Sequence, residues 1–381
     1  MKILFCGTIV PEKYDTRLEY LSPAANRFQI NFIKRLENLG HEVKILSHIG
    51  FPAETREFEA DKEFYPGRIK YVFRDLNIKA AVKNYKKAMK ELAPDADMVI
   101  AYNCTYLSIL VPDYAKKIKA ESVLILADFT DESDDFQYRL YIRAQLTGIR
   151  KFKHVVCLSE HTKKFLKRKQ HSYVMEGGID TKVFDRFEGV KEHDKEDKTV
   201  TFMYAGLLAP VTGVMQLVNA FAATEDPDLR LVISGKGDQD KDIKAAAEKD
   251  PRIEFAGYMG YQKYVDTLSN ADAVINPRDM SLSENKYNFP SKVMEYLASG
   301  SRIISTRFAG NERFNDYIDF CDSSEDALKE ALLNAADEIR KDRISGGEKA
   351  KEIFERNREF AKNFLWDNQV KRVLEEIGAA K

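Results

Sequence analysis

The residues whose types suit chemistry gather in one stretch, from Asn276 to Gly300. Within it, Arg278 and Lys292 lie on either side of the point where a polar loop gives way to a helix-like pattern. Ser291 can cap that helix, and the amide groups at the start of a helix attract anions. Two cations near such an end predict a ligand that carries more than one negative charge.

The same stretch carries side chains that suit a sugar. Glu295 lies one turn into the helix, where its carboxylate can accept hydrogen bonds from hydroxyl groups. Glu284, Lys286 and Tyr287 lie in the loop before the helix. A ligand with phosphates and a sugar has both features, so the stretch predicts a nucleotide-sugar site. The simpler alternatives are a cluster of weak, exposed ion pairs at a helix end and, for Tyr287, loop packing.

Length, charge and cysteine usage narrow the class of protein. At 381 residues the chain is long enough for two domains, and its net charge of -1 argues against a dedicated nucleic-acid binder. No apolar run approaches the roughly 20 residues that a membrane-spanning helix needs, and the first residues read as a strand and not as a signal peptide. The cysteines, which show no metal-ligand spacing, are Cys6, Cys104, Cys157 and Cys321. We therefore expect free thiols in a reducing cytoplasm.

Short apolar runs alternate with helical patterns along the chain, and the pattern starts again in the second half. The strand-like runs are 2–6, 42–47, 69–73, 98–102, 123–127, 154–158 and 172–175, then 200–205, 229–234, 253–255, 273–275 and 302–305. The helix-like stretches include 23–39, 80–92 and 160–169, then 214–223, 241–249, 262–268 and 291–298. This alternation predicts an α/β protein with two doubly wound domains, each built on a parallel sheet covered on both faces.

A charged, apolar-poor segment separates the two sets of patterns and reads as a linker. After the second set, a long amphipathic helical pattern covers 350–377 and is weakest at Asn363. We expect its last part, 360–381, to pack back on the first domain. The expected segments are 1–184 for the first domain, 185–198 for the linker and 199–359 for the second domain.

Ligands of doubly wound domains bind beyond the carboxyl ends of the strands, and two such domains in tandem place a cleft between their sheets. The stretch 276–300 lies at this edge of the second domain. In the first domain the matching places are the loop 7–26 and the loop that begins at Asp128. Asp128 directly follows a strand, so its carboxylate can accept a hydrogen bond from a hydroxyl group there. Capping of the next turn is the simpler alternative.

Several short motifs occur in a set order along most of the chain. They are Gly40-His41-Glu42-Val43, Gly178-Ile179-Asp180 with Phe184, Tyr204-Ala205-Gly206, Ala271-Asp272, NPR at 276–278 and FPSKVMEYLASG at 289–300. In this order they resemble the motifs of the family-4 glycosyltransferases with the GT-B fold, especially the members that build bacterial surface polysaccharides. The last two motifs are the most specific part of the resemblance.

The resemblance implies two tandem Rossmann-like doubly wound domains facing a cleft. It also implies a nucleotide-sugar donor held mainly by the second domain, an acceptor held mainly by the first, no metal or other cofactor, and retention of anomeric configuration. Arg278 and Lys292 would then bind the diphosphate. Glu295 would hold the ribose and Glu284 the sugar. Further donor contacts are assigned to Gly206, Lys236, Lys286, Tyr287 and Ser291.

The acid/base group is expected after a strand of the first domain, where many family members carry a His-Asp or Glu-Asp pair. Asp128 is the first candidate and Asp131 the second. Retaining transferases of this fold are often described with the leaving phosphate taking the acceptor proton, and in that case Asp128 orients the acceptor. Both roles stay open on the sequence.

The chain departs from the family pattern at three donor positions. The family motif is Glu, seven residues, Glu, and its first position here is Tyr287, although Glu284 can substitute. Leu207 and Thr212 stand where the family usually has basic residues. The two cations of the opening stretch must therefore carry more of the diphosphate binding.

The stretch 139–169 interleaves basic residues with aliphatic and aromatic ones. It reads either as a patch for the anionic inner face of the plasma membrane, suited to a lipid-linked acceptor, or as two solvated helix faces.

We expect a cytoplasmic glycosyltransferase of capsule or exopolysaccharide assembly that uses a nucleotide-diphosphate sugar, with UDP favoured, and a glycan or lipid-linked acceptor. The alternatives are a nucleotide-sugar epimerase and a non-catalytic, degenerate transferase that binds a glycan or a partner enzyme.

Overall fold

The chain forms two compact units. Unit 1 consists of Met1–Gly178 with Trp366–Lys381, and unit 2 consists of Ile179–Leu365. The segment 185–198, for which the sequence favours a linker, belongs to unit 2 in this division. The computed structural model describes residues 1–15, 21–49, 57–73, 77–129, 136–187, 189, 194–279, 281–282, 285–287, 289–308 and 310–378.

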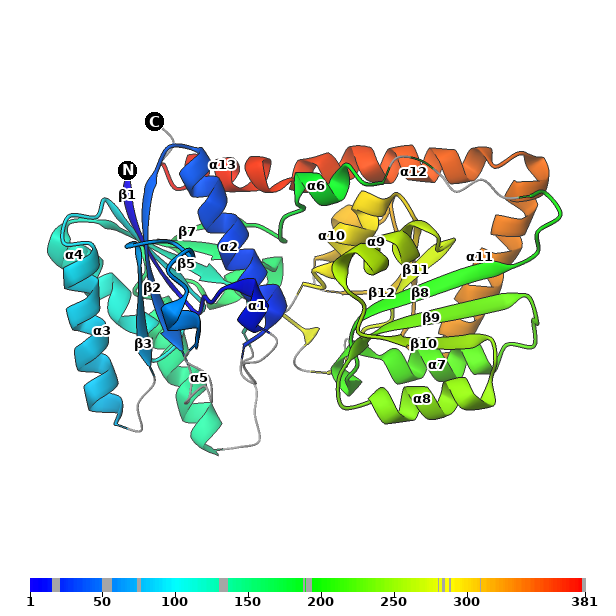
Figure 1. Ribbon diagram of the computed structural model, residues 1–381, viewed down its shortest axis with the longest axis horizontal. Helices are drawn as coiled ribbons and strands as arrows, with labels where there is room; N and C mark the ends of the chain where they lie inside the picture. Colours follow the sequence, from blue (N-terminus) through cyan, green and yellow to red (C-terminus); the bar gives the residue numbers. More distant parts are fainter. Residues whose placement is uncertain are drawn as a thin grey trace. The chain divides into compact units, whose positions relative to one another are not determined.

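Unit 1 is built on a parallel sheet whose described strands follow the order β3-β2-β1-β4-β5-β6-β7 (Figure 1). Within this sheet β1 pairs with β2 on one side and with β4 on the other. The strands are β1 (Lys2–Gly7), β2 (Glu42–Ile49), β3 (Ile69–Phe73), β4 (Met98–Tyr102), β5 (Glu121–Leu126), β6 (His154–Cys157) and β7 (His171–Val174). The α-helices are α1 (Glu12–Asp15), α2 (Pro23–Asn38), α3 (Ile78–Leu92), α4 (Val111–Ile118), α5 (Phe136–Ile149) and α13 (Trp366–Glu376). Short 3-10 helices are η1 (Glu57–Ala60), η2 (Ser108–Leu110) and η3 (Glu160–Phe165).

The last helix of the chain completes the core of unit 1. Figure 1 shows α13, in red, beside α2, in blue. Trp366 of α13 contacts Phe28 of α2 edge to face, with ring centroids 4.9 Å apart. The indole also covers Gly178 so closely that a β-carbon at Gly178 would collide with it. One buried cluster of unit 1 combines strand residues with four residues of α13, namely Trp366, Val370, Val373 and Leu374.

Unit 2 repeats the architecture with the described strand order β10-β9-β8-β11-β12-β13. The strands are β8 (Val200–Leu207), β9 (Leu229–Lys236), β10 (Ile253–Gly257), β11 (Ala273–Asn276), β12 (Arg302–Thr306) and β13 (Asp319–Cys321). The α-helices are α6 (Thr181–Phe184), α7 (Val214–Ala222), α8 (Asp240–Lys249), α9 (Tyr261–Ser269), α10 (Lys292–Ser299), α11 (Glu325–Ser345) and α12 (Glu348–Ala361). Short 3-10 helices are η4 (Pro210–Thr212), η6 (Asn311–Phe314) and η7 (Lys362–Phe364).

The sheet of unit 2 is buried on both faces. Met203 and Val274 face a cluster that includes α9, α10 and the end of α12. Phe202 and Ile275, the residues next to them in sequence, face a second cluster that includes α7 and α11. Figure 1 shows α7 and α8 on one side of this sheet and α9 and α10 on the other. The predicted doubly wound α/β fold is therefore confirmed.

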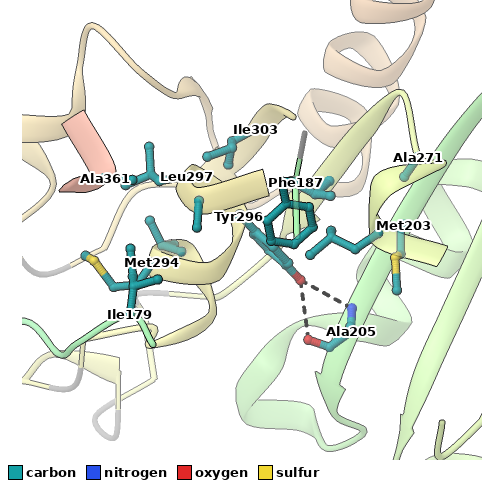
Figure 2. Close-up of a cluster of buried hydrophobic side chains, with 14 of the residues drawn as sticks. Ile179, Phe187, Met203, Ala205, Ala271, Met294, Tyr296, Leu297, Ile303 and Ala361 are labelled. Carbon is teal, nitrogen blue, oxygen red and sulfur yellow. Dashed lines mark hydrogen bonds between the residues drawn. The ribbon is translucent and has the colours of Figure 1, made fainter. Parts of the chain in front are cut away.

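The helix α10 is anchored to the sheet of unit 2 through its buried face (Figure 2). The hydroxyl of Tyr296 donates to the carbonyl oxygen of Ala205 in β8 and accepts from its amide, each at 3.3 Å. Gly300 ends the helix with φ 71°, the left-handed conformation that the sequence predicts there. A β-carbon at Gly300 would also collide with the ring of Phe354. The middle and the C-terminal end of α10 are therefore fixed against neighbouring elements.

Nearly every predicted strand and helix is confirmed within two residues at either end. Ser22 caps α2 by accepting a hydrogen bond from the amide of Ala25 at 3.3 Å. The stretch 160–169 is an exception, because it forms the 3-10 helix Glu160–Phe165 and then an extended residue. Like charges one turn apart, such as those of Lys163 and Lys167, disfavour a longer helix there. None of the described helices combines the length and apolarity needed to cross a bilayer.

The long C-terminal pattern is also divided. α12 ends at Ala361, η7 follows, and Leu365 is extended with ψ 137° before α13 begins. The helical pattern over 350–377 therefore forms two helices, and the break lies beside Asn363, the predicted weakest point of the pattern. Phe364 is buried in unit 2 and Trp366 in unit 1, so the two halves pack in different cores.

Candidate functional site

The strand order of unit 2 reverses between β8 and β11, which are neighbours in the middle of the sheet. In open α/β sheets ligands bind beyond the carboxyl ends of the strands at such a switch point. Two loops leave the sheet there, 208–213 from β8 to α7 and 277–291 from β11 to α10. The predicted donor residues lie on these loops, on α10 or at the ends of β8 and β9. Glu284 lies outside the described residues.

Asn285 joins the two loops at the switch point. It is only 1% exposed, and its Nδ2 donates to the carbonyl oxygens of Val211 at 2.7 Å and Asp279 at 2.8 Å. Its Oδ1 accepts a hydrogen bond from Nη1 of Arg278 at 3.1 Å. One buried amide therefore ties the β11–α10 loop to the β8–α7 loop and orients the guanidinium of Arg278.

Arg278 is held through its backbone as well. Its carbonyl oxygen accepts a hydrogen bond from the hydroxyl of Thr306 at the end of β12. Burial raises the pKa of Tyr204 in β8 to about 12, and the positive charge of Arg278 acts against this rise. The guanidinium is thus close enough to the end of β8 for its charge to act there.

Lys292, Glu295 and Tyr264 form one cluster at the start of α10. The Nζ of Lys292 lies 2.8 Å from Oε2 of Glu295 and 4.2 Å from the centre of the Tyr264 ring. The hydroxyl of Tyr264 donates to the same carboxylate oxygen at 2.8 Å. Tyr264 comes from α9 and is 7% exposed, whereas the side chains of Lys292 and Glu295 are 33% and 35% exposed. The cluster presents a cation and a carboxylate to solvent on a buried support.

The start of α10 differs from the prediction in one respect. Ser291 precedes the helix, but its side chain makes no capping hydrogen bond. The amides of Val293 and Met294 donate instead to the carbonyl oxygens of Pro290 and Ser291, at 3.0 and 3.2 Å. The tight turn after Pro290 satisfies these two donors, so the predicted side-chain cap is wrong. Side-chain cations are therefore better placed than these two amides to contact an anion here.

Gly206 and Lys236 lie at the ends of neighbouring strands, as the sequence predicts. Gly206 pairs with Gly235 in the sheet, and a β-carbon at Gly206 would lie 2.9 Å from the hydroxyl oxygen of Tyr204. Lys236 is exposed, with its Nζ 5.7 Å from the ring centre of Tyr258. Both residues therefore lie at the carboxyl edge of the sheet, on the β9 side of the switch point.

Lys286 and Tyr287 follow Asn285 in the β11–α10 loop. Lys286 is partly exposed, and Tyr287 is buried. The burial of Tyr287 favours loop packing, the alternative that the sequence left open, over a direct donor contact.

The two positions where the family has basic residues are used differently here. Leu207 is 54% exposed at the end of β8. Thr212 is buried, and its hydroxyl lies 2.9 Å from the carbonyl oxygen of Leu207 and 2.8 Å from that of Ala209. Thr212 holds the β8–α7 loop closed, so cationic contacts to a ligand have to come from β9, the β11–α10 loop or α10.

In unit 1, Asp128 follows β5 and is exposed at the carboxyl edge of the sheet. Asn103, which follows β4, donates from Nδ2 to Oδ2 of Asp128 at 3.2 Å. The Oδ1 of Asn103 accepts from the amides of Ala127 at 2.9 Å and Asp128 at 3.1 Å. Asn103 therefore ties the ends of two strands together and orients the carboxylate. Asp131, the second candidate, lies outside the described residues.

Sequence reasoning missed three residues that hold the predicted ones in place, namely Asn285, Tyr264 and Asn103. Asn285 lies in a loop without periodicity, and Tyr264 reads as an ordinary core residue of an amphipathic helix. Asn103 offered a usable signal, because it directly follows a predicted strand, as Asp128 does. The carboxyl ends of neighbouring parallel strands meet at one edge, so such residues can be expected to lie together.

A cavity of about 570 Å³ lies at the opposite edge of the unit 2 sheet. Its lining includes Asp272 and Arg302, which lie at the amino ends of β11 and β12. Several of its charged groups bind each other, as Arg343 does with Asp272 at 2.5 Å. The cavity does not coincide with the switch point, where the predicted donor residues gather.

Comparison with known proteins bears on the same part of the chain. Residues 199–338 match the family model described as glycosyl transferases group 1. The matched segment runs from the start of β8 into α11 and includes both loops of the switch point. No curated protein sequence matches the chain.

Solved structures resemble the chain over its length. HepE from Anabaena in complex with UDP has a TM-score of 0.73 at 14% identity, with 100% of both chains covered. A glycosyltransferase from Rickettsia africae has a TM-score of 0.70 at 16% identity, covering 99% of this chain and 98% of that one. The lipopolysaccharide outer core galactosyltransferase WaaB has a TM-score of 0.66 at 17% identity, with 100% of both chains covered. At these identities the likeness shows a shared fold, the GT-B fold.

The family match and the shared fold both point to the switch point of unit 2, where the predicted donor residues lie. The matched segment contains the switch point with Arg278, Lys292 and Glu295. Residues 199–338 are therefore a group 1 glycosyltransferase domain within a chain of GT-B fold, and the chain is a glycosyltransferase.

Proposed function

We propose that the chain is a retaining, metal-independent glycosyltransferase that moves a sugar from a UDP-sugar to a glycan or lipid-linked acceptor. The bond between the anomeric carbon and the diphosphate breaks, and a bond from that carbon to an acceptor oxygen forms. The hydroxyl proton passes either to the leaving diphosphate or to the carboxylate of Asp128. UDP is favoured because HepE, which has the same fold, was solved with UDP. Retention is proposed from the motifs shared with the family-4 transferases.

The observation that carries the proposal is the pair of supported cations at the switch point. Negative charge develops on the leaving diphosphate, and positive groups that are already in place stabilise it most effectively. Asn285 orients Arg278 at 3.1 Å, and Lys292 rests on the ring of Tyr264. Because these side chains supply the charge, we propose that turnover needs no metal ion.

The remaining roles follow from position. Glu295 lies beside Lys292, so we assign its carboxylate to the ribose hydroxyls and Lys292 to the phosphates. Glu284 is assigned to the transferred sugar. Asp128 is assigned to the acceptor hydroxyl, either as general base or as the group that orients it while the leaving phosphate takes the proton.

Nucleotide binding and product analysis test the proposal. We expect calorimetric titration in EDTA to show binding of UDP in preference to GDP and ADP. Incubation with UDP-sugars and glycan acceptors is expected to transfer the sugar at the same rate in EDTA, with the anomeric configuration retained by NMR. Release of an isomerised nucleotide sugar without acceptor would instead identify an epimerase. Absence of binding to all three nucleotides would point to a non-catalytic protein.

We also propose that 139–169 binds an anionic membrane surface that carries the lipid-linked acceptor. Arg139 and Arg143 are exposed on α5, and Leu140 between them is 48% exposed.

Replacing both arginines by glutamate is expected to abolish cosedimentation with phosphatidylglycerol vesicles, since about 1 kcal/mol per basic residue is lost and repulsion is added. The same change at Lys83 and Lys86, exposed on α3, alters net charge equally and should leave vesicle binding intact. Equal binding by all three proteins would rule this surface out.

A further inference from the structure

We infer that Tyr264 is a positioning residue that sets the ribose recognition of the donor site. The inference rests on the proposed function, because it takes Glu295 as the group that binds the ribose hydroxyls. Tyr264 lies on α9, the helix after β10, and neither the motifs nor the strand ends point to it. Its contacts with both charged residues of α10 single it out.

One aromatic side chain supports two oppositely charged groups. The face of the Tyr264 ring lies 4.2 Å from Nζ of Lys292, within the range of a cation–π contact. The hydroxyl at the edge of the same ring donates to Oε2 of Glu295 at 2.8 Å. Tyr264 itself is buried in the core cluster with Val293 and Leu268, so it moves little relative to α10.

The hydroxyl separates two tasks that would otherwise conflict. Lys292 also bonds to Oε2 of Glu295, at 2.8 Å. If Lys292 turns toward the phosphates of a ligand, a carboxylate held by the lysine alone would turn with it or lose its place. The bond from Tyr264 keeps Glu295 oriented while Lys292 moves. A carboxylate that stays in place can accept hydrogen bonds from the ribose, and hydrogen bonds to charged groups are among the stronger ones.

The substitution Tyr264→Phe tests this with little disturbance, because it removes the hydroxyl and keeps the ring under Lys292. We expect calorimetric titration to show UDP binding weakened roughly tenfold, the size of one lost hydrogen bond to a charged group. Binding of 2′-deoxy-UDP should weaken by less than about threefold, because part of the ribose contact is already missing. The preference for UDP over 2′-deoxy-UDP therefore shrinks.

Two further variants make the result specific. Tyr296→Phe makes the same change one residue after Glu295, where the hydroxyl bonds to the backbone of Ala205 (Figure 2). It should lower Tm and leave the ratio of the two affinities at the wild-type value. In a Glu295→Gln background, Tyr264→Phe should have no further effect on that ratio.

The outcomes separate this inference from the proposed function. A wild-type affinity ratio in Tyr264→Phe, with UDP still binding tightly, would overturn the role of Tyr264 and leave the proposed function standing. A ratio that falls equally in Tyr296→Phe would also overturn it, since loss of packing would then explain both. A wild-type protein that binds no ribonucleoside diphosphate would overturn both proposals together.

Discussion

Lys292→Ala is expected to lower kcat/KM for the nucleotide sugar by about 100- to 1000-fold, as is typical when one fixed group that stabilises developing charge is removed. The nearby Glu295 makes the loss larger, because its carboxylate keeps the hydrogen bond from Tyr264 and its negative charge beside the donor is no longer compensated by Lys292. Arg278→Ala is expected to cost a similar factor. Steady-state transfer assays with a labelled UDP-sugar measure both effects.

A neighbouring lysine supplies the control. Lys263 is exposed on α9, directly before Tyr264, and Lys263→Ala removes the same charge without touching the cluster. Its kcat/KM should stay within about twofold of the wild type, since exposed charges contribute little. Wild-type turnover in both Lys292→Ala and Arg278→Ala, with an unchanged Tm, would contradict the assignment of the donor site.

Removal of 366–381 is expected to unfold unit 1 and to leave unit 2 folded. The deletion takes Trp366, Val370, Val373 and Leu374 out of the unit 1 core, at about 1.5 to 3 kcal/mol for each buried side chain. The sum, roughly 6 to 12 kcal/mol, is comparable to the whole stability of a typical domain. Unit 2 keeps Ala361 and Phe364 in its own core. Limited proteolysis with mass spectrometry should therefore show cleavage throughout 1–178 and protection of 199–365.

UDP binding by the truncated chain and protease resistance of a shorter deletion both test this expectation. The truncated chain should still bind UDP, because the proposed donor residues are in unit 2, but it should transfer no sugar. A chain that ends at Gly378 keeps α13 whole and should resist protease like the full chain. Protection of unit 1 in the chain that ends at Leu365 would show that α13 is dispensable for its core.

The strands could be predicted from sequence because each is a short apolar run buried on both faces, and such a signal is local. β13, Asp319–Cys321, escaped prediction because it is three residues long at the edge of its sheet. The break at Leu365 is different, because the amphipathic period continues through it. Only the packing of Phe364 and Trp366 in two different cores decides where the helix must stop.

The charged residues of the candidate site could be predicted, whereas their supports could not. Arg278 and Lys292 are visible because a cation after a strand or at the start of a helix stands out in any sequence. Asn285 and Tyr264 act on partners 74 and 31 residues away in the chain, and no local pattern encodes those pairings. Asn285 can join the two loops because it is buried. Nothing in the sequence of a polar loop indicates that one of its polar residues is buried.

The place of α13 in unit 1 has a consequence for biosynthesis. The strands of unit 1 leave the ribosome first, yet Trp366 and the rest of α13 emerge only after the whole of unit 2. Domains generally fold in the order in which they are made, but here unit 1 cannot finish until unit 2 has been made. A nascent chain stalled before Trp366 would carry a finished unit 2 and an open apolar face on unit 1. That face is where chaperones would bind while translation continues.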